Sequence, residues 1–130
     1  MLFQAVHTLL KHDILKLIEA SEAGLTIDEI AAKQQGLSRY ALGLLLDMAL
    51  CGRIVLKRKE RYLLSRIGFF LLNDKMPRIN FNFTKDVCYR AMDALDLAIE
   101  KGKPAGLAEF SPEWETIYPH LSELPEPARK

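Results

Sequence analysis

The 130-residue sequence predicts a mainly α protein: a winged helix-turn-helix with a short β-hairpin wing, followed by a helical arm. Three observations predict this fold class. Two capped helical segments flank a short turn at Gln35-Gly36, which is the pattern of a helix-turn-helix. Two β-prone runs then surround a charged turn, and apolar residues recur at helical spacing in the second half of the chain.

The first predicted element is an amphipathic helix from Leu2 to about Ala20. Its apolar residues recur every three or four positions, which places them on one face of a helix. This stripe consists of Phe3, Val6, Leu10, Ile14 and Leu17. The sequence allows a kink near Lys11-His12-Asp13, because Asp13 could cap a fresh helical turn.

The helix-turn-helix begins at a capping box formed by Thr26 and Glu29. In such a box the hydroxyl and the carboxylate satisfy free backbone N–H groups reciprocally. Leu25 and Ile30 stand at the positions of a hydrophobic staple, which fixes the angle at which the chain enters the helix. A short helix is therefore expected to start after Thr26.

The next helix, capped by Ser38 and ended by Gly52, occupies the place of a recognition helix but is too apolar to read DNA. Base reading requires Arg, Asn, Gln, Ser or Lys along the outward face, and only Arg39, Tyr40 and Asp47 offer polar groups of useful size. A helix that is apolar almost all round is normally buried on more than one side. The sequence therefore predicts a packing or dimerisation element. Its expected dimer interface comprises the first helix and Leu42, Leu45, Leu46, Met48 and Ala49.

The wing is predicted from two β-prone runs, 53–56 and 61–64, on either side of the charged turn 57–60. The turn lacks the Gly or Asn of an ideal two-residue hairpin loop. Ser65 can cap a further short helix that ends near Leu72.

The arm follows a break at 73–77, and a long helix is expected from about Phe83 to Lys101, ended by Gly102 and Pro104. Ser111-Pro112 predicts the start of a last short helix, Glu113 to Leu121, which Pro119 would shorten. Leu124 to Lys130 is typical of a linker.

We expect two domains: a winged-helix dimerisation domain, 1–72, and a helical arm with a linker, 73–130. The linker-like end predicts that the natural protein continues into another domain.

Basic side chains surround the predicted wing and are opposed locally only by Glu60. They are Arg53, Lys57, Arg58, Lys59, Arg61 and Arg66. They could contact phosphate, or they could keep an edge ribbon soluble. We favour the second interpretation, because the recognition helix is poor and the net charge of the chain is only +1.

No pattern predicts catalysis or metal binding in these 130 residues. His7 and His12 lie about 140° apart around a helix, and the chain has no Cys- or His-rich metal motif, nucleophile elbow or Gly-rich nucleotide loop. We expect Cys51 and Cys88 to be free thiols in a reducing cytoplasm. No signal peptide or membrane span is predicted.

The aromatic residues are concentrated in the second half of the chain. Packing in a core or an interface is the simpler interpretation. The alternative is that some of them line a pocket for a flat organic ligand that another domain or subunit completes. Phe81 and Phe83 are the candidates for contact with a substrate or a partner.

Three segments resemble a known family. They are Leu25-Thr-Ile-Asp-Glu-Ile-Ala-Ala32, Gly36-Leu-Ser-Arg-Tyr-Ala-Leu-Gly-Leu-Leu-Leu-Asp-Met-Ala-Leu50 and the wing strands Gly52-Arg-Ile-Val-Leu56 and Arg61-Tyr-Leu-Leu-Ser65. Together they resemble the N-terminal winged-helix dimerisation domain of S-adenosylmethionine-dependent O-methyltransferases. The resemblance covers roughly Leu10 to Leu72, and the apolar third helix separates this family from DNA readers.

The resemblance implies a homodimer whose winged helix helps to cover the acceptor pocket of a catalytic methyltransferase domain. A long helical connection leads into that domain. The full enzyme would move a methyl group from S-adenosylmethionine to an oxygen of a small molecule, or less readily to nitrogen or carbon. Its cofactor loop and catalytic base would lie beyond Lys130, so no activity is expected from residues 1–130 alone.

Two other functions remain open from the residues. The first is a stand-alone winged-helix transcriptional regulator that touches DNA with Arg39, Tyr40 and the wing and dimerises through 83–101. The second is an adaptor whose winged helix makes only protein contacts.

Overall fold

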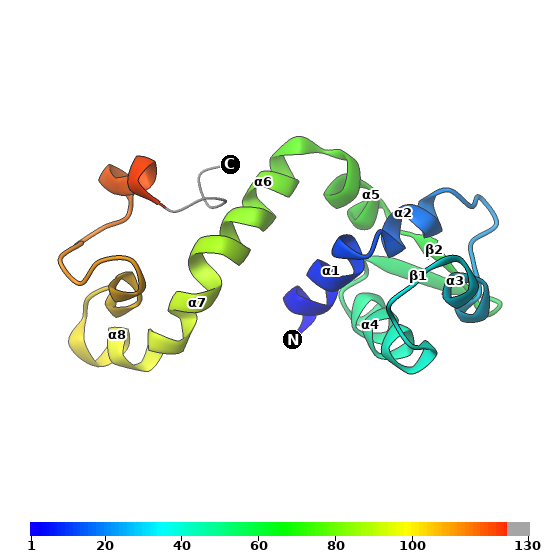
Figure 1. The fold of residues 1–130 in the computed structure, drawn as a ribbon, viewed down its shortest axis with the longest axis horizontal. Coiled ribbons are helices and arrows are strands. Elements are labelled where there is room, and N and C mark those ends of the chain that lie inside the picture. Colours follow the sequence, from blue (N-terminus) through cyan, green and yellow to red (C-terminus); the bar gives the residue numbers. More distant parts are fainter. Residues whose placement is uncertain (125–130) are drawn as a thin grey trace. The chain divides into compact units, whose positions relative to one another are not determined.

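The computed structural model describes residues 1–124 and divides the chain into two compact units, Met1–Asp74 and Lys75–Lys130. Both units are mainly helical, and the only sheet among the described residues is a two-stranded hairpin in the first unit. The predicted fold class, a winged helix followed by a helical arm, is confirmed (Figure 1).

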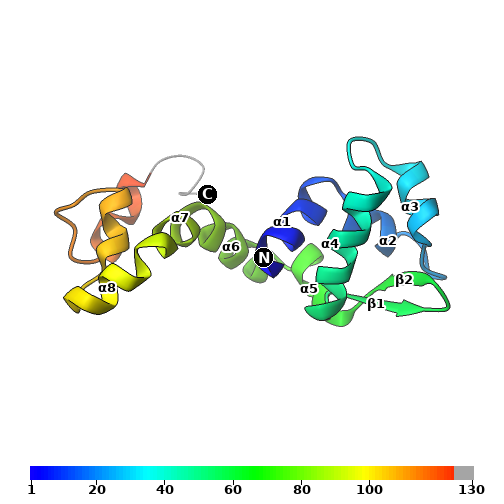
Figure 2. The same cartoon turned by 90° about the horizontal axis from the view of Figure 1, so that it is seen from below.

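The first unit is the winged helix. Figures 1 and 2 show its hairpin at the edge of the unit, with the turn on the side of α3. Its elements are α1 (Leu2–Lys11), α2 (Ile14–Glu19), α3 (Ile27–Lys33), α4 (Arg39–Cys51), β1 (Val55–Arg58), β2 (Arg61–Leu64) and α5 (Arg66–Asn73).

The expected kink in the first helix is a complete break between α1 and α2. Asp13 adopts the left-handed conformation with φ of 56°, a backbone state that a few Asp and Asn residues tolerate. Its side chain does not cap α2; its carboxylate pairs with the ammonium of Lys16 at 2.7 Å. The expectation that Asp13 would cap a new turn is therefore wrong.

The other helix caps predicted in the first unit are confirmed. The Glu29 N–H donates to Thr26 Oγ1 at 3.2 Å and the Thr26 N–H donates to Glu29 Oε2 at 2.8 Å, which completes the capping box. Ser38 and Ser65 accept backbone N–H groups at the starts of α4 and α5 in the same way. Short-range sequence signals therefore fix where three helices of the first unit begin.

A continuous apolar core joins the helices of the first unit to its hairpin. Helix α1 packs against α4, and α2 packs against β2 and α5. Burying one such aliphatic side chain contributes about 1.5–3 kcal/mol. The fully buried large side chains of this unit are Leu9, Ile14, Leu15, Ile18, Ile30, Leu42, Leu46 and Val55.

The wing differs from its prediction in register. Strand β1 begins at Val55, two residues later than expected, and Arg58 pairs with Arg61. The turn is therefore a two-residue loop, Lys59-Glu60, with positive φ at both positions. Such a loop normally uses Gly or Asn. Because Lys59 and Glu60 are neither, the sequence did not indicate that this turn has only two residues.

The wing is anchored to the rest of the first unit at two points. Leu25 and Tyr62 exchange backbone hydrogen bonds of 3.0 and 2.7 Å, which joins the start of the helix-turn-helix to β2. At the other end, a Cβ on Gly68 would lie 2.3 Å from the backbone oxygen of Ile54. Only glycine therefore lets α5 approach the start of the hairpin this closely.

The second unit is a helical arm followed by short turns. Its elements are α6 (Lys75–Phe83), the π-helix η1 (Thr84–Cys88), α7 (Tyr89–Ala91), the 3-10 helix η2 (Met92–Ala94), α8 (Leu95–Lys101) and the 3-10 helices η3 (Ala105–Glu109) and η4 (Tyr118–Glu123).

The arm corrects two predictions. The helix starts at Lys75 instead of Phe83, because Pro77 lies in the first turn, where its missing N–H is not needed. The helix expected from Glu113 to Leu121 is absent, since only η4 forms there. The end of the long helix at Gly102, with φ of 61°, is confirmed.

None of the helices within residues 1–124 combines the length and the apolar character needed to cross a membrane. The linker expected from Leu124 to Lys130 lies almost wholly outside the described residues.

Candidate functional site

Helix α4 does not offer the interface that the sequence suggested. Leu42, Leu46 and Ala49 have no exposed surface, because they pack into the core of their own unit. A partner cannot contact them while this core is intact, so we remove these three from the expected dimer interface. Leu45 and Met48 are partly exposed and stay available to a partner.

The exposed residues of α4 are Arg39, Tyr40, Leu44, Asp47 and Cys51. Tyr40 is 76% exposed and Leu44 is 52% exposed. Apart from Arg39 at its start, the helix exposes no Arg, Lys, Asn or Gln to base edges, and its acidic residue would meet phosphate with the wrong charge. This exposed surface of α4 is therefore unsuited to reading DNA.

Arg39, the basic residue at the start of this helix, is held within its own unit. Its Nε donates to an oxygen of Asp28 on α3. The hydrogen bond from Arg39 lowers the pKa of Asp28, and the same contact raises the pKa of Arg39. A DNA phosphate would have to compete with this carboxylate.

Arg61 of the wing also forms its hydrogen bonds within the first unit. Its two terminal nitrogens donate to the two carboxylate oxygens of Glu29 at 2.9 and 3.1 Å, and one of them also donates to the Gly24 carbonyl at 2.8 Å. The pKa of Glu29 is lowered, chiefly by the backbone N–H of Thr26 and then by Arg61. This network joins β2 to the start of α3, so Arg61 holds the wing against the helix-turn-helix.

Lys57 has a local role of the same kind. Its ammonium lies 2.8 Å from a carboxylate oxygen of Glu60 and 5.5 Å from the centre of the Tyr62 ring. The hydrogen bond with Glu60 is the main reason that its pKa is raised. Two of the six basic side chains around the wing thus have partners within the hairpin or α3, which favours a role in folding and solubility.

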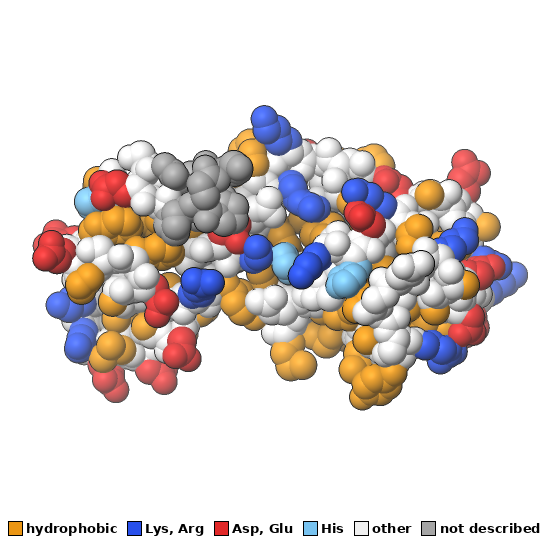
Figure 3. All heavy atoms as spheres, in the orientation of Figure 1, with side chains coloured by type: hydrophobic (Ala, Val, Ile, Leu, Met, Phe, Trp, Pro, Cys, Tyr) orange, Lys and Arg blue, Asp and Glu red, His pale blue; other side chains and the backbone are white. Residues whose placement is uncertain are grey.

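The second unit, which contains the arm, lacks a hydrophobic core of its own. Among the described residues of the second unit, only Val87 and Leu124 are buried hydrophobic side chains. On the face drawn in Figure 3, hydrophobic side chains of this unit reach the surface among acidic ones. Its exposed large hydrophobic side chains are Met76, Ile79, Tyr89, Met92, Leu95, Leu97, Ile99, Tyr118 and Leu121.

An arm of this kind requires a partner surface. Isolated exposed hydrophobic residues are ordinary, but a contiguous apolar surface marks an interaction site. Met92, Leu95 and Ile99 are 59%, 50% and 71% exposed and follow one another at helical spacing across η2 and α8. We therefore identify this arm surface, defined by Met92, Leu95 and Ile99, as the main candidate interface.

The two aromatic residues singled out in the sequence have different positions. Phe83 lines an apolar cavity of about 260 Å³ within the second unit, together with Val87, Cys88 and Phe110. Phe81 is half-buried and does not line this cavity. The sequence did not single out the other lining residues, because they belong to segments separated by about twenty positions that only the fold brings together.

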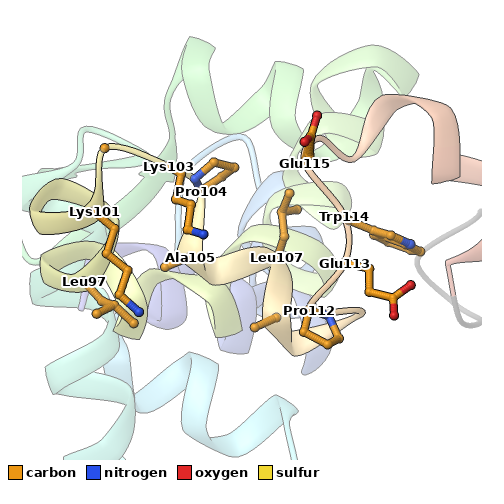
Figure 4. Close-up of a pocket in the computed structure, with 12 residues that line it drawn as sticks. Leu97, Lys101, Lys103, Pro104, Ala105, Leu107, Pro112, Glu113, Trp114 and Glu115 are labelled. Atoms are coloured by element: carbon orange, nitrogen blue, oxygen red, sulfur yellow. The ribbon is translucent and has the colours of Figure 1, made fainter.

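A second hollow, of about 630 Å³, lies between the end of α8 and the segment after η3. Figure 4 shows Lys101 beside Leu97, with the Glu113 carboxylate and the Trp114 ring on the opposite side. The charged groups do not converge on a common point, which a catalytic site requires. Within residues 1–124, no three His, Cys, Asp or Glu side chains gather so as to hold a metal ion.

Comparisons with known proteins agree with this geometry. Residues 1–62 match the family model described as the Dimerisation2-like domain. Among solved structures, the chain is similar to the crystal structure of the S-adenosylmethionine-dependent methyltransferase SibL in its apo form, with a TM-score of 0.75 and 18% sequence identity. The likeness covers 98% of this chain and 38% of that one, and it shows a shared fold. A comparison with curated protein sequences gave no match.

Proposed function

We propose that this chain, whose residues 1–62 belong to the Dimerisation2-like domain family, is the dimerisation and substrate-covering part of a small-molecule methyltransferase that uses S-adenosylmethionine. The observation that carries the proposal is the pairing of this domain with an arm that has no core of its own. Such an arm is stable only against another surface, and a second copy of the chain supplies one.

The homodimer would use the arm surface of Met92, Leu95 and Ile99, with Leu45 and Met48 of α4 as secondary contacts. This replaces the wider set of α4 residues expected from the sequence, because three of those are buried in their own unit. Stable interfaces bury about 800 Å² on each partner, which requires several large apolar side chains per chain. The exposed hydrophobic residues of the arm are numerous enough for an interface of that size.

The methyl transfer itself would be carried out by residues outside this chain. The sequence has no Gly-rich strand-loop for the cofactor, and the described residues bring no base and nucleophile together. S-adenosylmethionine would supply an electrophilic methyl group. The new carbon–oxygen bond to the acceptor would form as the methyl–sulfur bond breaks, which would leave S-adenosylhomocysteine and release the proton of the acceptor hydroxyl. The contribution of this chain would be to hold two copies together and to cover the acceptor, with Phe81 and Phe83 as candidate contacts.

We also place the protein in the cytoplasm, because Cys51 and Cys88 are free thiols.

The test is a methyl-transfer assay with the protein encoded by the complete gene, using S-adenosylmethionine labelled in its methyl group. We expect label to move to a small molecule when the complete protein is present. The 130-residue chain alone should neither bind the cofactor nor transfer label. A complete protein that neither binds S-adenosylmethionine nor dimerises would contradict the proposal.

A further inference from the structure

We propose that the second unit contains its own binding site for a small, uncharged, flat hydrocarbon group of about two rings. The site is the cavity of about 260 Å³ bounded by the helical run from Phe83 to Met92 on one side. Pro104, Leu107 and Ile117 bound it on the other side. All of these residues belong to one unit, so the cavity needs no second chain to exist.

The helical side of the cavity is built by an irregular turn. Phe83, Val87 and Ala91 follow one another every four residues and face the cavity together. The π-helix Thr84–Cys88 lies in the middle of this stretch and widens the helix by one residue per turn. Cys88 is therefore brought to the cavity beside Val87. Turns of this kind are frequent at functional sites.

The opposite side of the cavity is held close by a glycine. A Cβ placed on Gly106 would lie 2.7 Å from the Ala91 carbonyl oxygen and 2.7 Å from the Ala91 Cβ. Any larger residue would push η3 away from α7. The contact holds the two sides of the cavity close together at Gly106, and Phe110 also lines the cavity.

The chemistry of the lining selects the ligand. No lining side chain is charged, and the Cys88 thiol is the only polar side chain among them. A charged ligand would lose its hydration without gaining a partner. An apolar cavity of about 150 Å³ is large enough to bind benzene, so the larger volume here fits a two-ring group such as naphthalene.

The pocket is open to solvent, so part of its apolar lining is exposed to water. A flat hydrocarbon that covered this lining would remove apolar surface from water, which is favourable. This inference does not depend on methyl transfer, because binding can be measured on the 130-residue chain without any cofactor.

The experiment uses the two cysteines of the natural chain. Cys88 lines the cavity, whereas Cys51 lies exposed on α4 in the other unit. We would measure the rate at which each thiol is alkylated, by mass spectrometry of peptides, with and without naphthalene. At ten times its dissociation constant, bound naphthalene should slow the alkylation of Cys88 about tenfold. The alkylation of Cys51 should be unchanged.

A matched pair of variants tests the location. Ile117→Trp places a large ring at a residue that lines the cavity, whereas Tyr118→Trp places the same ring at the next residue, which does not line it. Neither residue belongs to the arm surface of Met92, Leu95 and Ile99; Ile117 is half-buried and Tyr118 is 78% exposed, so neither variant should unfold the chain. We expect Ile117→Trp to abolish the protection of Cys88 and Tyr118→Trp to retain it. Equal alkylation of Cys88 with and without naphthalene in the natural chain would overturn the proposal, as would equal protection in the two variants.

Discussion

The two units of this chain both begin with amphipathic helices, but they bury their apolar faces in different ways. In the first unit, α1, α2, α4 and the hairpin enclose a shared core, and residues such as Leu9 and Leu46 have no exposed surface. In the second unit, α6, α7 and α8 bury no residue at all. An amphipathic pattern thus predicts that a helix has an apolar face, but it does not say which chain covers that face.

The starts of the helices also differ between the two units. Helices α3, α4 and α5 of the first unit each start at a Thr or Ser whose side chain accepts a backbone N–H. Helices α7 and α8 have no such cap, and they continue directly from η1 and η2, so their first turns are stabilised by the preceding helical backbone and not by a side chain. Capping stabilises a helix without any partner, so the first unit carries within itself the interactions that define it. The arm depends more on what packs against it.

The largest expected effect is on stability, and it distinguishes a buried residue of the first unit from an exposed residue of the second. Leu46→Ala removes a fully buried side chain and should lower the free energy of unfolding by about 2–5 kcal/mol. Ile99→Ala removes a side chain that is 71% exposed and should change the stability of the monomeric chain by less than about 0.5 kcal/mol. Urea titration monitored by circular dichroism, at concentrations where the chain is monomeric, would measure both. Similar losses for the two variants would break the comparison.

A smaller effect is expected at the capping box. Thr26→Ala removes the hydroxyl that accepts the Glu29 N–H and should cost about 1 kcal/mol of stability. Thr26→Ser keeps the hydroxyl and serves as the control, with a stability close to that of the natural chain. If Thr26→Ala were as stable as Thr26→Ser in the same urea titration, the cap would not contribute to the independence of the first unit.

The smallest expected effect is a dependence on pH. The pKa of Glu29 is lowered in the folded chain, first by the Thr26 N–H and then by Arg61. The stabilisation is therefore fully present above the unfolded pKa of about 4.3. It is lost as the pH falls through the lower folded value. Glu29→Gln should flatten this acid-side fall in melting temperature.

The matched control for that pH dependence is Glu22→Gln, which changes an exposed carboxylate that forms no ion pair with any described residue. We expect it to leave the shape of the profile unchanged. An unchanged profile for Glu29→Gln would mean that the wing is not held to α3 by this network.

The sequence was sufficient to predict the parts of the fold that depend on neighbours along the chain. The caps at Thr26, Ser38 and Ser65 and the end of α8 at Gly102 are local signals, and the structure confirms them. The turn Lys59-Glu60 was missed because its positive φ values are imposed by strand pairing and not by a residue type that favours them.

The site was harder to predict because it depends on contacts between distant segments. Leu42, Leu46 and Ala49 recur at helical spacing and could have faced a partner, but they are fully buried in a unit where α4 packs against α1, α3 and β1. Phe83 was singled out as an aromatic residue, yet its position in a cavity depends on Leu107 and Phe110, which lie in segments after Gly102. The helix expected from Glu113 failed because Ser111 offers only a long contact of 3.5 Å to the Glu113 N–H, which does not start a helix.

The central claim is that the arm is covered by a second copy of the chain, and sedimentation equilibrium tests it most directly. The natural chain should form a dimer at micromolar concentration. Leu95→Gln combined with Ile99→Gln should weaken that dimer at least about tenfold. Leu44→Gln, at a residue of the first unit that is 52% exposed, should leave it unchanged. A natural chain that is monomeric at micromolar concentration, or a Leu44→Gln variant as impaired as the arm variant, would contradict the account.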